Sequence, residues 1–130
     1  MRVSTSPRIA LVAAFALALS DAGVAAVGPP LLILSQRVGR PGAEVHVVGV
    51  NCSRPAAGDE LIWRDAYQYA NDRHQRPADP PFRRVRLTRV SRTRVEAIFV
   101  VLRTDHRGRG IFTLFCGGGH NPFNTFTVTR

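Results

Sequence analysis

Six arginines lie within twelve consecutive residues of this sequence, and no acidic residue interrupts them. Guanidinium groups attract phosphates and other anions, so the series could bind an anionic polymer in a salt-dependent way. It could equally be the solvated face of an edge strand, whose charges prevent association with another sheet. Because aromatic residues do not alternate with the arginines, we expect no specific recognition of nucleic acids. The candidate binding residues are Arg83, Arg84, Arg86, Arg89, Arg92 and Arg94.

Residue patterns for catalysis or metal binding are weaker. None of the four histidines stands in a ligand spacing such as His-Glu-x-x-His. Neither Ser53 nor Ser91 lies in the Gly-x-Ser-x-Gly turn of a nucleophilic serine, and no local pattern pairs two carboxylates. We therefore expect no enzymatic activity, no cofactor and no metal ion.

A second group of residues could bind a small apolar molecule. Outward-facing apolar side chains on two predicted strands, together with a tryptophan, would form a patch that needs a cover. A ligand, a second copy of the chain or the long polar loop over residues 71–81 could supply that cover. The residues of this alternative patch are Trp63, Ile98, Val100, Ile111 and Phe115.

The first 26 residues have the pattern of a cleaved export signal. Two arginines precede an unbroken apolar run over residues 9–19, and Ala26 offers a small residue for cleavage. The apolar run is shorter than the roughly 20 residues that span a bilayer, so we expect no transmembrane segment after cleavage. The sequence predicts a signal peptide over 1–26 and one secreted extracellular domain over 27–130.

The predicted secreted domain is strongly cationic. The whole chain has a formal net charge of +9, and all 18 of its basic residues are arginine. The signal holds two of these arginines and one aspartate, so the domain keeps a net charge of +8. An anionic partner fits this charge, although a GC-rich genome would produce the same bias toward arginine.

The two cysteines are predicted to form a disulfide. Exported chains meet an oxidising environment, in which a pair of cysteines usually cross-links. A bond between Cys52 and Cys116 would close a loop of 65 residues. In the chain-entropy model such a loop stabilises a small domain by about 4 kcal/mol.

The remaining residues predict strands. Runs rich in Val, Ile, Phe and Thr alternate between apolar and polar positions, with Gly, Pro and Asp between the runs. Helical patterns are almost absent after the signal. The predicted strands cover residues 31–36, 45–51, 60–69, 85–90, 95–102, 111–116 and 124–130.

Two of these strands hold residues that need a special position. Alternation in the second strand would turn Cys52 outward, so we predict a bulge at Gly49 that turns the sulfur inward. In the third strand an aspartate, Asp65, shares a face with aromatic residues and is not expected in the core. Trp63 is predicted to be buried, and Tyr67 is expected toward a sheet end or loop.

The order of the cysteines and the tryptophan indicates a particular sandwich. Cys52 ends an early strand, Trp63 lies on the next strand, and Cys116 ends a late strand. This order is typical of immunoglobulin-like domains, in which the disulfide joins the two sheets. The predicted fold is therefore an all-β, immunoglobulin-like antiparallel sandwich of about seven strands with one inter-sheet disulfide.

Two short motifs carry a family resemblance. The first is Gly39-x-Pro41-Gly42-x-x-Val45-x-Val47-x-Gly49-x-x-Cys52, and the second is Arg107-Gly108-x-Gly110-x-Phe112-x-Leu114-x-Cys116. They resemble immunoglobulin-like domains of secreted actinobacterial proteins and, more distantly, apoproteins of the neocarzinostatin type. The resemblance implies a fold. It implies no particular activity, because this sandwich hosts many unrelated functions.

Charge, export and fold together predict a secreted, non-enzymatic binding module. It would contact an anionic component of the cell envelope, or another protein, through the arginine series and neighbouring loops. The alternative prediction is a carrier that holds an apolar small molecule in a cleft of the sandwich.

Overall fold

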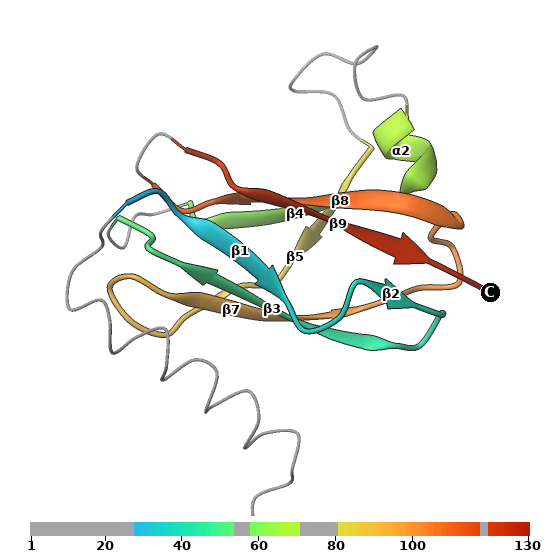
Figure 1. Ribbon diagram of the computed structural model, residues 1–130, viewed down its shortest axis with the longest axis horizontal. Coiled ribbons are helices and arrows are strands. Elements are labelled where there is room, and N and C mark those ends of the chain that lie inside the picture. The colour runs from blue at the N-terminus through green and yellow to red at the C-terminus, as the bar shows by residue number, and fades with distance from the viewer. Residues whose placement is uncertain (1–27, 54–57, 71–80, 118–119) are drawn as a thin grey trace, which may run out of the picture.

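A computed structural model describes residues 28–53, 58–70, 81–117 and 120–130. The predicted signal peptide and all but the last residue of the 71–81 loop lie outside these ranges. Two β-sheets pack face to face with the apolar residues between them (Figure 1). Within the described ranges, no helix is both long and apolar enough to span a bilayer.

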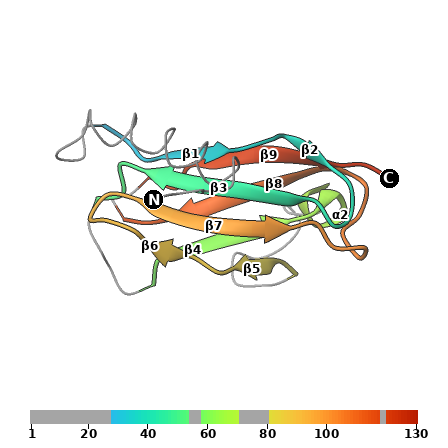
Figure 2. The same cartoon turned by 90° about the horizontal axis from the view of Figure 1, so that it is seen from below.

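The first sheet has four strands, and all of its neighbouring strands are antiparallel. Its first strand leads from the N-terminal region into the sandwich, and its last is a short edge strand (Figure 2). The order across the sheet is β1 (Leu31–Leu34), β3 (Glu44–Val50), β7 (Val95–Val100) and β6 (Thr88–Arg89).

The second sheet has five strands. All of its pairings are antiparallel except that of its first two strands, which run parallel. The order across the sheet is β2 (Val38–Gly39), β9 (Phe123–Val128), β8 (Gly108–Phe115), β4 (Glu60–Arg64) and β5 (Arg83–Val85). The strand order in the two sheets is that of an immunoglobulin-like sandwich, so the predicted fold is confirmed.

The predicted strand over 85–90 is two strands in different sheets. β5 pairs with β4, whereas β6 pairs with β7. Val85 and Leu87 both pack against the core between the layers, so the chain crosses from one sheet to the other near Arg86. On the opposite edge, the chain also passes from one sheet to the other between β1 and β2. At each edge of the sandwich, the chain therefore crosses between the sheets.

Aromatic rings fill one half of the core. Trp63 is 0% exposed, as predicted, and its ring centroid lies 4.7 Å from that of Phe112 and 5.0 Å from that of Phe99. Phe126 meets the tryptophan edge-on at 6.0 Å. Tilted and edge-on contacts of this kind add to the stabilisation from apolar burial. They fix the strands that lead to one end of the sandwich.

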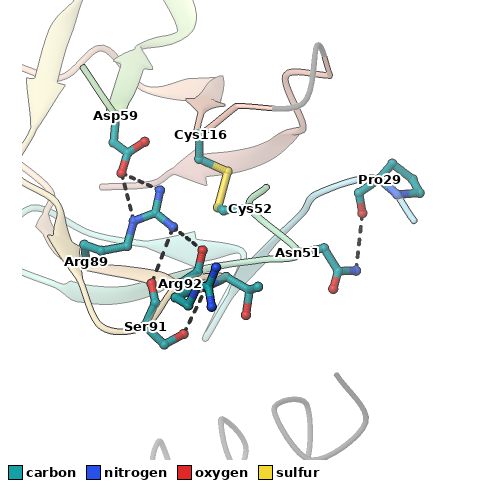
Figure 3. The surroundings of a disulfide bond; sticks show 9 residues. Pro29, Asn51, Cys52, Asp59, Arg89, Ser91, Arg92 and Cys116 are labelled. Atoms are coloured by element: carbon teal, nitrogen blue, oxygen red, sulfur yellow. Dashed lines mark hydrogen bonds and ion pairs between the residues drawn. A yellow bond between two sulfur atoms is a disulfide. The ribbon is translucent and has the colours of Figure 1, made fainter. Parts of the chain in front are cut away.

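The disulfide lies in the other half of the core. The predicted bulge at Gly49, which would turn Cys52 toward it, is wrong. The pairing of β3 with β7 continues without interruption from Glu44 to Gly49. Gly49 faces the core, where an added Cβ would lie 2.4 Å from Leu114 Cδ2. The left-handed conformation of Asn51, with φ 59°, breaks the alternation instead and turns Cys52 toward Cys116 (Figure 3). Asparagine tolerates this conformation better than most residues.

The predicted strand over 60–69 is also wrong in its second half. β4 ends at Arg64, and a short helix, α2 (Ala66–Ala70), follows. The Asp65 carboxylate accepts the Gln68 N–H at 3.0 Å, and the Gln68 side chain accepts the Asp65 N–H at 3.0 Å. This reciprocal capping begins the helix. Asp65 is buried, contrary to the prediction, because it receives these and further hydrogen bonds. Tyr67 lies exposed beyond the strand, as expected.

Candidate functional site

Four arginines of the predicted binding series are engaged with carboxylates. The partner carboxylates lie before or within β4, within β7 and in the turn after β7. Three of the four are remote in sequence from the arginine that they bind. Each of these guanidinium charges is partly neutralised by its carboxylate, which weakens its attraction for an external anion. The pairs are Arg83 with Asp105 (2.7 Å), Arg84 with Glu60, Arg89 with Asp59 (2.7 Å) and Arg94 with Glu96 (3.2 Å).

Arg89 illustrates a structural role. Its Nε and Nη2 donate to one oxygen of Asp59 at 3.0 and 2.7 Å, and its Nη1 donates to the Arg92 carbonyl at 2.8 Å (Figure 3). The side chain therefore ties the turn after β6 to the segment before β4. Arg86 and Arg92 are exposed, and no ion pair joins either of them to a carboxylate of the described residues. The series does not form a continuous binding strand.

The residues of the alternative apolar patch do not come together. Trp63 is enclosed in the core. Ile98 is 57% exposed and lies with Val100 on β7, whereas Ile111 and Phe115 lie on β8. The two strands belong to different sheets whose inner faces meet, so these outward side chains point in opposite directions. They cannot line one cleft.

Another set of arginines gathers at one end of the sandwich. This end carries β2, the connection between β7 and β8, and the C-terminus, which lie together in both views (Figures 1 and 2). All six arginines there are exposed. We call this region the arginine end, and its members are Arg37, Arg40, Arg103, Arg107, Arg109 and Arg130.

Backbone hydrogen bonds hold the segments of the arginine end together. The carbonyl of Arg37 accepts the Thr127 N–H at 2.8 Å, and Arg109 lies opposite Thr127 in the β8–β9 register. The Gly42 N–H donates to the Val101 carbonyl at 2.8 Å, which places the turn after β2 beside the end of β7. Three separate stretches of sequence thus present their arginines at one surface.

A buried aspartate organises the connection between β7 and β8. Asp105 is 5% exposed, and its carboxylate accepts three hydrogen bonds: from Trp63 Nε1 at 3.0 Å, Arg83 Nη2 at 2.7 Å and the Leu102 N–H at 2.7 Å. Its main-chain carbonyl accepts Arg130 Nη2 at 2.8 Å. Hydrogen bonds to an ionised carboxylate are among the strongest in proteins, so this network constrains the turn.

A second buried aspartate holds the end of the same connection. Asp65 Oδ2 accepts the His106 N–H at 3.0 Å and faces His106 Nδ1 at 2.8 Å, which implies that Nδ1 carries a proton. Burial of the Asp65 carboxyl acts to raise its pKa, but hydrogen bonds from Gln68 and His106, with the imidazole charge, outweigh burial and lower the pKa below 3.8. Asp65 is therefore an anion around neutral pH.

The two aspartates explain the charge of the arginine end. Both carboxylates point inward and are satisfied by donors of the protein itself, whereas the six arginines are exposed. Within the described ranges, Glu44 is the exposed acidic side chain of this end. The surface is therefore strongly positive, and its shape is fixed by a buried hydrogen-bond network.

Replacing Asp65 by asparagine should lower the free energy of unfolding by about 1 kcal/mol near neutral pH, because the cap remains but the charged bond to His106 is lost. Since the folded-state pKa of Asp65 is lowered, its stabilisation is complete above the unfolded-state pKa of about 3.9 and is lost as the pH falls through the folded-state value. Urea unfolding at a series of pH values measures this. A difference between the two proteins that stays constant into strong acid would contradict it.

The sequence contains a signal for part of this site. Asp65 and Gln68 have the spacing of a capping box before a short helix, whereas the alternation of Trp63 and Tyr67 predicts a strand. The arginine end has no comparable signal. Its residues come from distant turns and strand ends, which only the tertiary fold brings together.

Comparisons with known proteins add little to this picture. No family model matches the chain, and no curated protein matches it. Among solved structures, it is similar at 12% identity and a TM-score of 0.35 to a Bacteroides thetaiotaomicron protein provisionally named a phosphatase. The match covers 76% of this chain and 18% of that protein, so the chain spans less than a fifth of its length. A likeness this weak implies no shared function. Fold and site define an immunoglobulin-like domain with one cationic end.

Proposed function

We propose that this domain is a secreted, non-enzymatic binding module whose arginine end docks onto an anionic polymer of the cell envelope. The observation that carries the proposal is the separation of charge at this end. Six arginines are exposed, while Asp65 and Asp105 are buried and internally paired. Guanidinium groups suit phosphate and carboxylate partners, which they bind through paired hydrogen bonds.

Rigidity supports the same role. The connection between β7 and β8 is held by hydrogen bonds to Asp65 and Asp105, so the arginines that it carries need little ordering on binding. Preorganisation of this kind reduces the entropy lost when a partner binds. The buried disulfide and the predicted signal peptide favour a place outside the cell for the partner as well.

Two sets of arginines allow a matched test of the binding surface. Changing Arg103, Arg107 and Arg109 together to glutamine should weaken binding to a polyanion such as heparin about tenfold, because each exposed ion pair contributes about 0.5 kcal/mol. The control changes Arg84, Arg86 and Arg92 to glutamine, which alters the net charge equally. Isothermal titration at low salt measures both.

The control triple variant should lose less than about twofold in affinity, because the charges removed lie away from the arginine end. Equal losses in the two variants would show that binding follows net charge alone. A larger loss in the control variant would assign binding to the arginine series over residues 83–94. Either result would contradict the proposal.

A further inference from the structure

An exposed aromatic ring borders the arginine end. Tyr67 is 60% exposed, and its ring centroid lies 5.1 Å from that of His106 at an interplanar angle of 30°. The imidazole thus supports one face of the tyrosine ring. Charge attraction to a polyanion does not require such a ring, so its placement calls for a reason of its own.

The ring pair is held in place by the network that shapes the arginine end. Asp65 bonds both the main-chain and the ring nitrogen of His106, and together with Gln68 it caps the helix that carries Tyr67. The backbone positions of both ring-bearing residues are therefore fixed. A fixed aromatic ring offers a large contact area at a small cost in conformational entropy.

The ring pair is adjacent to two of the exposed arginines. Arg107 follows His106 directly, and Arg109 lies two residues further along, at the start of β8. Helix α2 packs on the same segment, since an added Cβ on Gly108 would lie 3.0 Å from the Ala66 Cβ. A ligand at this border would meet a flat ring and guanidinium groups at the same time.

We propose that the polymer bound by the arginine end is an acidic polysaccharide, and that Tyr67 stacks on the face of one of its sugar rings. The proposal rests on the proposed function. A sugar ring presents C–H groups on its face and, in acidic sugars, a carboxylate at its rim, which matches an aromatic ring beside guanidinium groups. A ring-free polyanion would use the guanidinium groups alone.

Single-stranded nucleic acid also combines rings with charge, but the structure favours the polysaccharide. Proteins that bind single strands stack successive bases on several aromatic side chains along a basic groove. Here one stacked ring pair, Tyr67 with His106, stands at the border, and the described residues show no row of such rings along the arginines. The predicted export of the chain also favours a polymer of the cell exterior.

The test compares two polyanions of matched charge, oligogalacturonate and ring-free polyphosphate, against the wild-type domain and its variants. Tyr67→Ala should weaken binding of oligogalacturonate at least about fivefold, in the range of an aromatic stacking contact. Its affinity for polyphosphate should stay within about twofold, because the charges are unchanged. Tyr67→Phe keeps the ring and should restore binding of oligogalacturonate.

Tyr69→Ala is the matched control. Tyr69 lies on the same helix two residues further on, which places it on a different side of α2 from Tyr67. It should leave both affinities within about twofold of wild type. Near-ultraviolet circular dichroism of each variant checks that the fold is kept.

Three results would overturn the inference. Equal losses for the two polyanions in Tyr67→Ala, or no loss for oligogalacturonate, would show that the ring takes no part. A larger Tyr67-dependent loss for oligothymidylate than for oligogalacturonate would assign the site to single-stranded nucleic acid. If neither oligogalacturonate nor polyphosphate binds the wild-type domain, the proposed function fails together with the inference.

Discussion

Replacing Asp105 by alanine should lower the free energy of unfolding by about 3–5 kcal/mol, because three donors lose one buried acceptor. The change leaves the Trp63 indole N–H, the Leu102 N–H and the Arg83 guanidinium without their acceptor. The guanidinium also lies 4.6 Å from the Phe99 ring centroid, a position that its bond to Asp105 helps to hold. Urea unfolding followed by Trp63 fluorescence measures the effect.

A second aspartate provides the matched control for this measurement. Asp59 also pairs with an arginine, Arg89, but its side chain is 16% exposed, compared with 7% for Asp105. Asp59→Ala should cost about 1 kcal/mol, because water can replace part of the lost interaction. Equal costs for the two variants would show that Asp105 does not organise the core in the way described.

Removing the disulfide should have an effect of similar size. The sequence separation of Cys52 and Cys116 is 64, and opening so large a loop should lower the free energy of unfolding by about 4 kcal/mol in the chain-entropy model. Both cysteines are 0% exposed and join strands of opposite sheets. The variant Cys52→Ala/Cys116→Ala removes the bond without leaving reactive thiols. Urea unfolding of this variant and of the wild type measures the difference.

Reductant provides the internal control for the disulfide. The wild-type protein should lose stability when reductant is added during unfolding, whereas the double alanine variant should unfold at the same urea concentration with or without it. The account is contradicted if reductant leaves the unfolding midpoint of the wild-type protein unchanged and this midpoint equals that of the double alanine variant. The bond would then contribute nothing to stability.

The sandwich could be predicted from the sequence because its signals are local or follow strand alternation. Val45 and Val47 alternate with outward residues, and the order of Cys52, Trp63 and Cys116 specifies which strands lie in opposite sheets. The same alternation is present in the folded strands, because one face of each strand must be buried. The core and the disulfide can therefore be predicted from the sequence.

The departures arise where hydrogen bonding overrides alternation. Residues 65–70 alternate like a strand, but the capping pair Asp65 and Gln68 supplies local hydrogen bonds that begin a helix. After β3, the left-handed conformation of Asn51 reverses the alternation without a bulge. Neither effect changes the apolar pattern, so neither is visible in it.

The carboxylate partners of the arginine series could not be predicted from the sequence, because most of these ion pairs join distant segments. Arg83 and Arg89 stand in a stretch without acidic residues, yet the fold brings Asp105 and Asp59 to them from distant segments. Conversely, Arg37 and Arg109 are far apart in sequence, and the pairing of β2, β9 and β8 brings them to the two sides of Thr127. Local charge density over residues 83–94 therefore does not reveal the ion pairs that the fold forms there.

The central claim is that anions bind at the arginine end, and mapping backbone amide shifts by nuclear magnetic resonance tests it most directly. On titration with an anionic polysaccharide, the largest shifts should fall in residues 37–43, 101–109 and 127–130, and they should fade as salt is raised. The largest shifts in residues 83–94, or small shifts spread evenly over the domain, would contradict the account.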